Sequence, residues 1–173
     1  MSAHTPGPWK FYEENNYGGS VELGNSNCTV ALDRDGNVWF GAVNDTAVVR
    51  YDGRSFERFG TPTPNPYGFS TVFVTRQGKV WRGGRHGLDV PECWSGEAWE
   101  APADAPNTDV LAIDEEPGGS VWFAGLETLW RFDGKHWTRH GTEQGLPSGF
   151  QTAWPRARGL ACDAEGNVWL ALG

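Results

Sequence analysis

The chain has 173 residues, with 14 Lys and Arg against 22 Asp and Glu, which gives a net charge of -8. This charge opposes binding to nucleic-acid phosphates or anionic lipid, so neither is an expected partner. No apolar run reaches the ~20 residues needed to cross a bilayer, and the N-terminus lacks the basic-then-apolar order of a signal peptide. We therefore expect a cytoplasmic chain without membrane insertion. The 24 Gly and 10 Trp favour many short strands joined by tight turns.

A repeated strand pair runs through most of the chain. The segments DRDGNVWFGA (33 to 42), TRQGKVWRGG (75 to 84), EPGGSVWFAG (116 to 125) and DAEGNVWLAL (163 to 172) share the order Gly, any residue, Val, Trp. The repeated tryptophans, spaced by 42, 41 and 47 residues, are Trp39, Trp81, Trp122 and Trp169. A fixed period of this length is the signature of a repeat architecture and not of a sandwich.

A second motif follows each of the first three strand pairs. It places a Gly three residues before an aromatic residue in the segments 48 to 60, 92 to 103 and 129 to 141. The first copy predicts strands at Thr29 to Leu32, Val38 to Gly41, Val48 to Tyr51 and Phe56 to Phe59, with turns at Asp35-Gly36-Asn37 and Asp52-Gly53. Four strands in ~40 to 45 residues is the make-up of a propeller blade, so we predict an all-β propeller of about four four-stranded blades.

The ends of the chain interrupt this pattern. We predict a single domain over residues 1 to 173, with whole blades at about 28 to 59, 70 to 101 and 109 to 140 and a partial blade at about 158 to 173. Residues 9 to 12 (WKFY) resemble a fourth strand and are expected to close that partial blade. The alternatives are a partial ring, a ring completed by a second copy of the chain, and a piece of a longer protein.

The stretches DRDGNVWFGAVNDTAVVRYDGRSFERFG (33 to 60) and LWRFDGKHWTRHGTEQGLPSGFQ (129 to 151) resemble the repeats of the two-component regulator propeller family. The family pattern is a D-x-x-G-N-hydrophobic-W strand pair, a Y/F-D-G turn and a G-L-P-S loop. The second copy departs from it at Thr75, where an acid is expected, and at Trp94-Ser95-Gly96. The resemblance implies a ligand-sensing or interaction module, of the kind found in the often periplasmic sensor regions of hybrid histidine kinases.

Binding residues are expected where the copies differ, because a residue repeated in every blade usually packs one blade against the next. The four repeated tryptophans are accordingly predicted to be structural. We expect a small polar ligand, a glycan or a protein to bind on the channel face, which the loops between second and third strands and the connections between blades would form. The candidates on these segments are Asn44, Asp45, Arg85, His86, Glu127, Tyr67, Asn107 and Gln151.

Neither a metal nor a cofactor is expected. Asp33, Asp35 and Asn37 alternate as in a calcium loop, but ordinary turn chemistry accounts for them. His136 and His140 would lie roughly 13 Å apart on a strand, too far to share one metal ion. The three cysteines have no CxxC spacing and are predicted to be free, mostly buried thiols; they are Cys28, Cys93 and Cys162.

Three functions remain open at this point. The leading hypothesis is a non-catalytic propeller that binds a ligand on its channel face. The second is an architectural module that assembles through its incomplete blade. The third is a lyase or hydrolase that uses His86 with a carboxylate such as Asp45 or Glu127. The G-N-V-W-F strand also occurs in propeller lyases acting on a streptogramin antibiotic, but the sequence has no catalytic His and metal arrangement that matches theirs.

Overall fold

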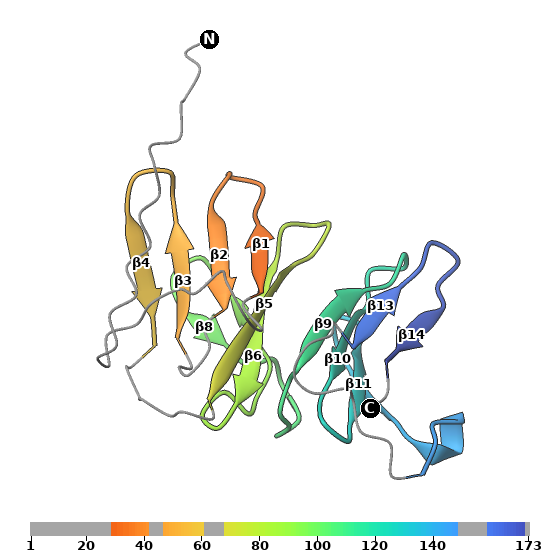
Figure 1. Cartoon of the computed structure of the whole chain (residues 1–173). Helices are drawn as coiled ribbons and strands as arrows, with labels where there is room; N and C mark the ends of the chain where they lie inside the picture. The colour runs from red at the N-terminus through yellow and green to blue at the C-terminus, as the bar shows by residue number, and fades with distance from the viewer. Residues whose placement is uncertain (1–28, 42–46, 61–67, 149–158, 172–173) are drawn as a thin grey trace.

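The computed structural model describes residues 29–41, 47–60, 68–148 and 159–171, and Figure 1 shows their arrangement. Apart from the short 3-10 helix η1 (Thr142–Gln144), the regular elements are strands, as expected for an all-β protein. Blade 1 consists of β1 (Val30–Leu32), β2 (Val38–Gly41), β3 (Val48–Tyr51) and β4 (Phe56–Phe59). Blade 2 consists of β5 (Phe69–Val74), β6 (Val80–Arg85), β7 (Glu92–Trp94) and β8 (Trp99–Glu100). Blade 3 consists of β9 (Ala112–Glu115), β10 (Val121–Ala124), β11 (Leu129–Phe132) and β12 (Trp137–His140), and the described part of blade 4 of β13 (Leu160–Cys162) and β14 (Val168–Leu170).

Each blade is an antiparallel meander whose strands pair in chain order. The first strands of successive blades lie next to one another, β1 by β5, β5 by β9 and β9 by β13. The sheets thus succeed one another face to face along an arc, which is how the blades of a propeller are arranged (Figure 1). The four strands predicted for the first copy are all present, with β1 beginning one residue later than expected.

All four repeated tryptophans were predicted to pack one blade against the next, and three of them do so. Trp39 is 1% exposed and its ring contacts the aromatic pair Trp94 and Trp99 of blade 2, at centroid distances of 5.9 and 5.7 Å. Val72 and Val80 of blade 2 belong to the same cluster. We call the surface of a blade that contacts the preceding blade's tryptophan its receiving face.

The next two interfaces repeat this arrangement. Trp81, 2% exposed, contacts the pair Phe132 and Trp137 on the receiving face of blade 3, at 5.6 and 6.5 Å. Trp122, 7% exposed, contacts the receiving face of blade 4, which is formed by Leu160, Cys162, Val168 and Leu170. Burying an indole of this size is a large apolar contribution to each interface.

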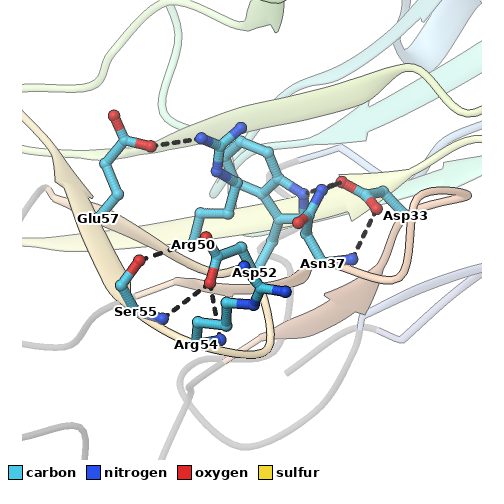
Figure 2. Close-up of polar contacts among 8 residues, drawn as sticks. Asp33, Asn37, Arg50, Asp52, Arg54, Ser55 and Glu57 are labelled. Atoms are coloured by element: carbon cyan, nitrogen blue, oxygen red, sulfur yellow. Dashed lines mark hydrogen bonds and ion pairs between the residues drawn. The ribbon is translucent and has the colours of Figure 1, made fainter.

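The Asp-x-x-Gly-Asn turn fixes the tryptophan through a hydrogen bond to its indole N–H. In blade 1 the Asp33 carboxylate accepts hydrogen bonds from the backbone amides of Asp35 and Asn37, from the Asn37 side chain and from Trp39 Nε1, all within 3.0 Å. Figure 2 shows this turn beside the second one, where Asp52 accepts the amides of residues 54 and 55. Each carboxylate oxygen of Asp33 already accepts two hydrogen bonds within the turn, which supports the turn interpretation over a calcium loop.

Both ends of the arc expose apolar side chains. Trp169, the fourth repeated tryptophan, is 65% exposed, unlike its three counterparts. On the receiving face of blade 1, Val30, Leu32 and Phe56 are 43%, 66% and 59% exposed. The predicted strand at residues 9 to 12 lies outside the described residues, as does Cys28, so the closure of blade 4 remains a prediction. Cys93 and Cys162 are half-buried, somewhat less than the mostly buried thiols expected.

Candidate functional site

Three segments meet along one edge of blades 2 and 3. They are the β6–β7 loop at residues 86 to 91, the connection between the blades at 101 to 111, and the β10–β11 loop at 125 to 128. The Thr108 amide donates to the Asp89 carbonyl at 2.6 Å, and the hydroxyls of Thr108 and Thr128 lie 2.7 Å apart. The Leu126 amide donates to the Asp109 carboxylate at 3.2 Å. These bonds link the three segments into one continuous edge.

The β6–β7 loop has a defined shape. His86 has a positive φ of 58°, and its backbone amide donates to Asp89 Oδ1 at 3.0 Å. The Gly87 amide donates to the other carboxylate oxygen of Asp89 at 3.3 Å. A non-glycine residue in the left-handed region is uncommon outside Asn, Asp and His. The carboxylate therefore holds a turn that leaves the His86 side chain exposed next to half-buried Arg85.

The structure places four of the eight predicted site residues on this edge. Arg85 and His86 lie at the end of β6, Asn107 is exposed one residue before the Thr108 bridge, and Glu127 is exposed in the β10–β11 loop. These four residues therefore lie on neighbouring segments, and their role in binding remains a prediction. The other four lie outside the described residues; they are Asn44, Asp45, Tyr67 and Gln151.

An open hollow of about 460 Å³ adjoins this edge at Glu127 and lies along the end of β12 and η1. Its lining is predominantly polar and includes residues with both donors and acceptors: Glu127, Arg139, His140, Gly141, Thr142, Glu143, Gln144 and Pro147. Gln144 is held in place because its side-chain oxygen accepts the Gly141 amide at 2.8 Å, which also defines the short helix η1. Only Glu127 in this lining was among the sequence candidates. Arg139 and His140 end the last strand of blade 3, and the other lining residues follow it in the segment that contains the G-L-P-S motif.

His140 is a half-buried side chain in the lining of the hollow. Its ring packs against Trp122 with centroids 4.6 Å apart, and Nε2 is buried without a hydrogen-bond partner among the described residues. Burial, together with the nearby positive charge of Arg131, lowers the pKa of His140 below its usual value. The lowered pKa favours the neutral imidazole near pH 7, which carries one donor and one acceptor nitrogen, of which Nε2 is buried.

The glutamate of the blade 3 turn lies beneath this histidine. Glu116 accepts hydrogen bonds from Arg131 Nη2 at 2.6 Å and from Trp122 Nε1 at 2.9 Å. The bond from Arg131 is the largest cause that lowers the pKa of Glu116, to about 2. The ion pair of Glu116 and Arg131 thus fixes the Trp122 ring, against which the His140 ring packs.

No family model matches the sequence, and no curated protein matches it either. Solved structures do. The extracellular domain of the putative hybrid two-component system BT3049 from B. thetaiotaomicron aligns with a TM-score of 0.64 at 16% identity, over 93% of this chain and 26% of that one. Virginiamycin B lyase from Staphylococcus aureus aligns with a TM-score of 0.60 at 14% identity, over 91% of this chain and 50% of that one.

A structure described as streptogramin B lyase aligns with a TM-score of 0.61 at 17% identity, over 87% of this chain and 50% of that one. At such identities the likeness shows the fold alone, and these neighbours are propellers. The chain therefore has a β-propeller fold and spans about half the length of the lyases that it matches. Within the described residues, no helix is long and apolar enough to cross a membrane.

Proposed function

We propose that this propeller is a non-catalytic binding module that takes a small polyhydroxylated ligand, such as a glycan, in the hollow beside blade 3. The observation that carries the proposal is the mixed lining of that hollow. Sugar hydroxyls both donate and accept hydrogen bonds, so they require acceptors such as Glu127 and donors such as Arg139 in one place. The likeness to the extracellular domain of a two-component system, a sensor-type protein, supports a sensing role.

The linked loop edge supports the same assignment. Loops that are fixed by hydrogen bonds on a rigid scaffold lose little conformational entropy when a ligand binds, which favours affinity. Arg85, His86 and Asn107 would extend the contact surface from the hollow toward blade 2. The exposed His86 and Asn107 beside half-buried Arg85 suit the outer units of an oligosaccharide more than a deeply enclosed small molecule.

The test is an array of oligosaccharides probed with the full chain, followed by calorimetry with the sugars that bind. Glu127→Gln combined with Arg139→Ala should weaken binding at least tenfold, which corresponds to about 1.4 kcal/mol. His86→Asn is the matching test of the loop edge, because Asn tolerates the left-handed backbone at this position while the imidazole is lost. The control is Lys135→Ala, in the exposed β11–β12 turn away from the hollow. Unchanged affinity in both site variants, for every sugar that binds, would refute the proposal.

A further inference from the structure

The two ends of the arc carry the two halves of one blade interface. An interface inside the chain needs a tryptophan on one blade and a receiving face on the next. Blade 4 presents Trp169, which is 65% exposed. Blade 1 presents a receiving face with exposed Leu32 and Phe56.

The correspondence with the internal interfaces is position by position. Val30 of blade 1 occupies the place of Val72 in blade 2, three residues before the first turn residue, and both precede a Val-Trp strand. Val72 is 4% exposed beneath Trp39, whereas Val30 is 43% exposed. Val72 and Val80 are buried on the receiving face of blade 2, and Val121 and Phe132 on that of blade 3, whereas the face of blade 1 keeps exposed apolar side chains.

The aromatic pair makes the same point. Tyr51 and Phe56 lie opposite each other on β3 and β4, with ring centroids 4.6 Å apart. Their counterparts in blade 2 are Trp94 and Trp99, at 5.3 Å, and Trp39 covers them. The pair in blade 1 occupies the equivalent positions, yet Phe56 is 59% exposed.

The exposure is confined to these two surfaces. Among the described residues, the large hydrophobic side chains that are exposed are Val30, Leu32, Phe56 and Trp169. Three lie on the receiving face of blade 1, and the fourth is the tryptophan of blade 4. Soluble proteins rarely leave such contiguous apolar faces uncovered unless a partner occupies them.

We propose that the Trp169 face of one copy docks on the receiving face of blade 1 in a second copy. In the described structure β1 packs beside β5 and β13 beside β9, so the two surfaces terminate opposite ends of the arc (Figure 1). They are complementary to each other and not to themselves, which makes the contact head-to-tail. The chain aligns with 50% of each matched lyase, so two copies would supply about as many blades as one such propeller. This inference is independent of the proposed ligand.

The decisive experiment uses two full-length variants, one for each surface. Trp169→Glu places a charge in the tryptophan position, and Leu32→Glu places one on the receiving face. Both positions are about two-thirds exposed, 65% and 66%, so either substitution leaves the described core intact. Thermal unfolding followed by circular dichroism checks that each variant folds. The control is Lys135→Glu, which alters charge in an exposed turn away from both surfaces.

Light scattering should give the wild type and the control a mass of at least twice 19.0 kDa, and each variant alone 19.0 kDa. An equimolar mixture of the two variants should recover a species of twice 19.0 kDa, because one intact surface of each kind remains. A wild type at the monomer mass would mean that a segment of the chain itself covers these faces, and would overturn the proposal. Assembly that survives Trp169→Glu, or a mixture that stays monomeric, would overturn it as well.

Discussion

The first and last described turns of the repeat make the same hydrogen bonds in different surroundings. Asp33 accepts Trp39 Nε1 at 2.8 Å, and Asp163 accepts Trp169 Nε1 at 2.9 Å. The backbone and side-chain bonds from the asparagine four residues after each aspartate agree within 0.1 Å. Yet Trp39 is 1% exposed and Trp169 is 65% exposed.

This difference separates what the local sequence determines, the turn and its hydrogen bonds, from what tertiary packing determines, the burial of the indole. The turn and its indole bond form from seven consecutive residues, so they are present whether or not another blade follows. Burial of the indole depends on a receiving face some 40 residues further along the chain. Substitutions at matched positions in blades 1 and 4 can therefore measure what the neighbouring blade contributes.

The largest expected change in the free energy of unfolding comes from removing the buried indole ring. Trp39→Ala should lower the free energy of unfolding by about 3 to 5 kcal/mol, because a large cavity opens between blades 1 and 2. Trp169→Ala should cost about 0.5 kcal/mol, the usual scale for a surface substitution. Urea unfolding, at concentrations where light scattering shows 19.0 kDa, compares the two. Equal losses would mean that Trp169 is buried in the monomer.

The next largest change in the free energy of unfolding is expected from removing the turn carboxylates of Asp33 and Asp163. Burial raises the pKa of Asp33, but hydrogen bonds from Trp39 and Asn37 outweigh it and keep the pKa below its usual value. Asp33→Ala should cost about 2 kcal/mol, because the buried Trp39 N–H then has no acceptor. Asp163→Ala should cost less, because water can reach Trp169. Urea unfolding of both variants measures this, and a larger loss at Asp163 would contradict the explanation.

Blade 2 offers the reverse experiment. Thr75 stands in place of the acid, and its hydroxyl accepts a hydrogen bond from the Lys79 amide. Buried Trp81 Nε1 has no hydrogen-bond partner among the described residues. Thr75→Asp should therefore raise the free energy of unfolding by about 1 kcal/mol at neutral pH, by supplying the acceptor. Thr75→Val is the control and should lower it, since the Lys79 bond is lost. A destabilised Thr75→Asp protein would show that desolvation of the new charge exceeds the gain.

The repeat motif predicted the all-β propeller fold because the turns and the strand alternation depend on residues that are adjacent in the sequence. The four strands of blade 1 and the structural role of Trp39, Trp81 and Trp122 could be inferred in this way. The exposure of Trp169 could not, because its motif is the same as that of Trp39 and only the presence of a following blade distinguishes them. Position in the array, and not residue identity, decides burial here.

The candidate site was predictable only in outline. Variation between copies drew attention to Arg85, His86 and Glu127, and the structure places them on adjoining loops. The hollow beside Arg139 and His140 was missed, because its shape depends on how η1 folds back by the end of β12 and no residue spacing records that contact. The G-L-P-S motif, which follows directly, was the available signal that this connection differs from the others.

The smallest effect is a dependence on pH that sets blade 3 apart. Glu116 takes the place of Asp33, and its longer side chain also reaches Arg131, which lowers its pKa from 4.5 to about 2. A lowered carboxyl pKa stabilises the folded state above pH 4.5, and this contribution is lost as pH falls from 4.5 toward 2. Because the pair is partly exposed, the loss should be below about 1 kcal/mol.

Thermal unfolding of the wild type and of Glu116→Gln between pH 7 and pH 2 isolates this contribution. The wild type should be the more stable at pH 7, and the difference should shrink as acid protonates the carboxylate. Arg131→Gln is the companion variant: without the guanidinium the pKa of Glu116 returns toward its ordinary value, so the acid-dependent part of the stability becomes smaller. A difference between wild type and Glu116→Gln that stays constant down to pH 2 would mean that shape, and not charge, holds the glutamate in the blade 3 turn.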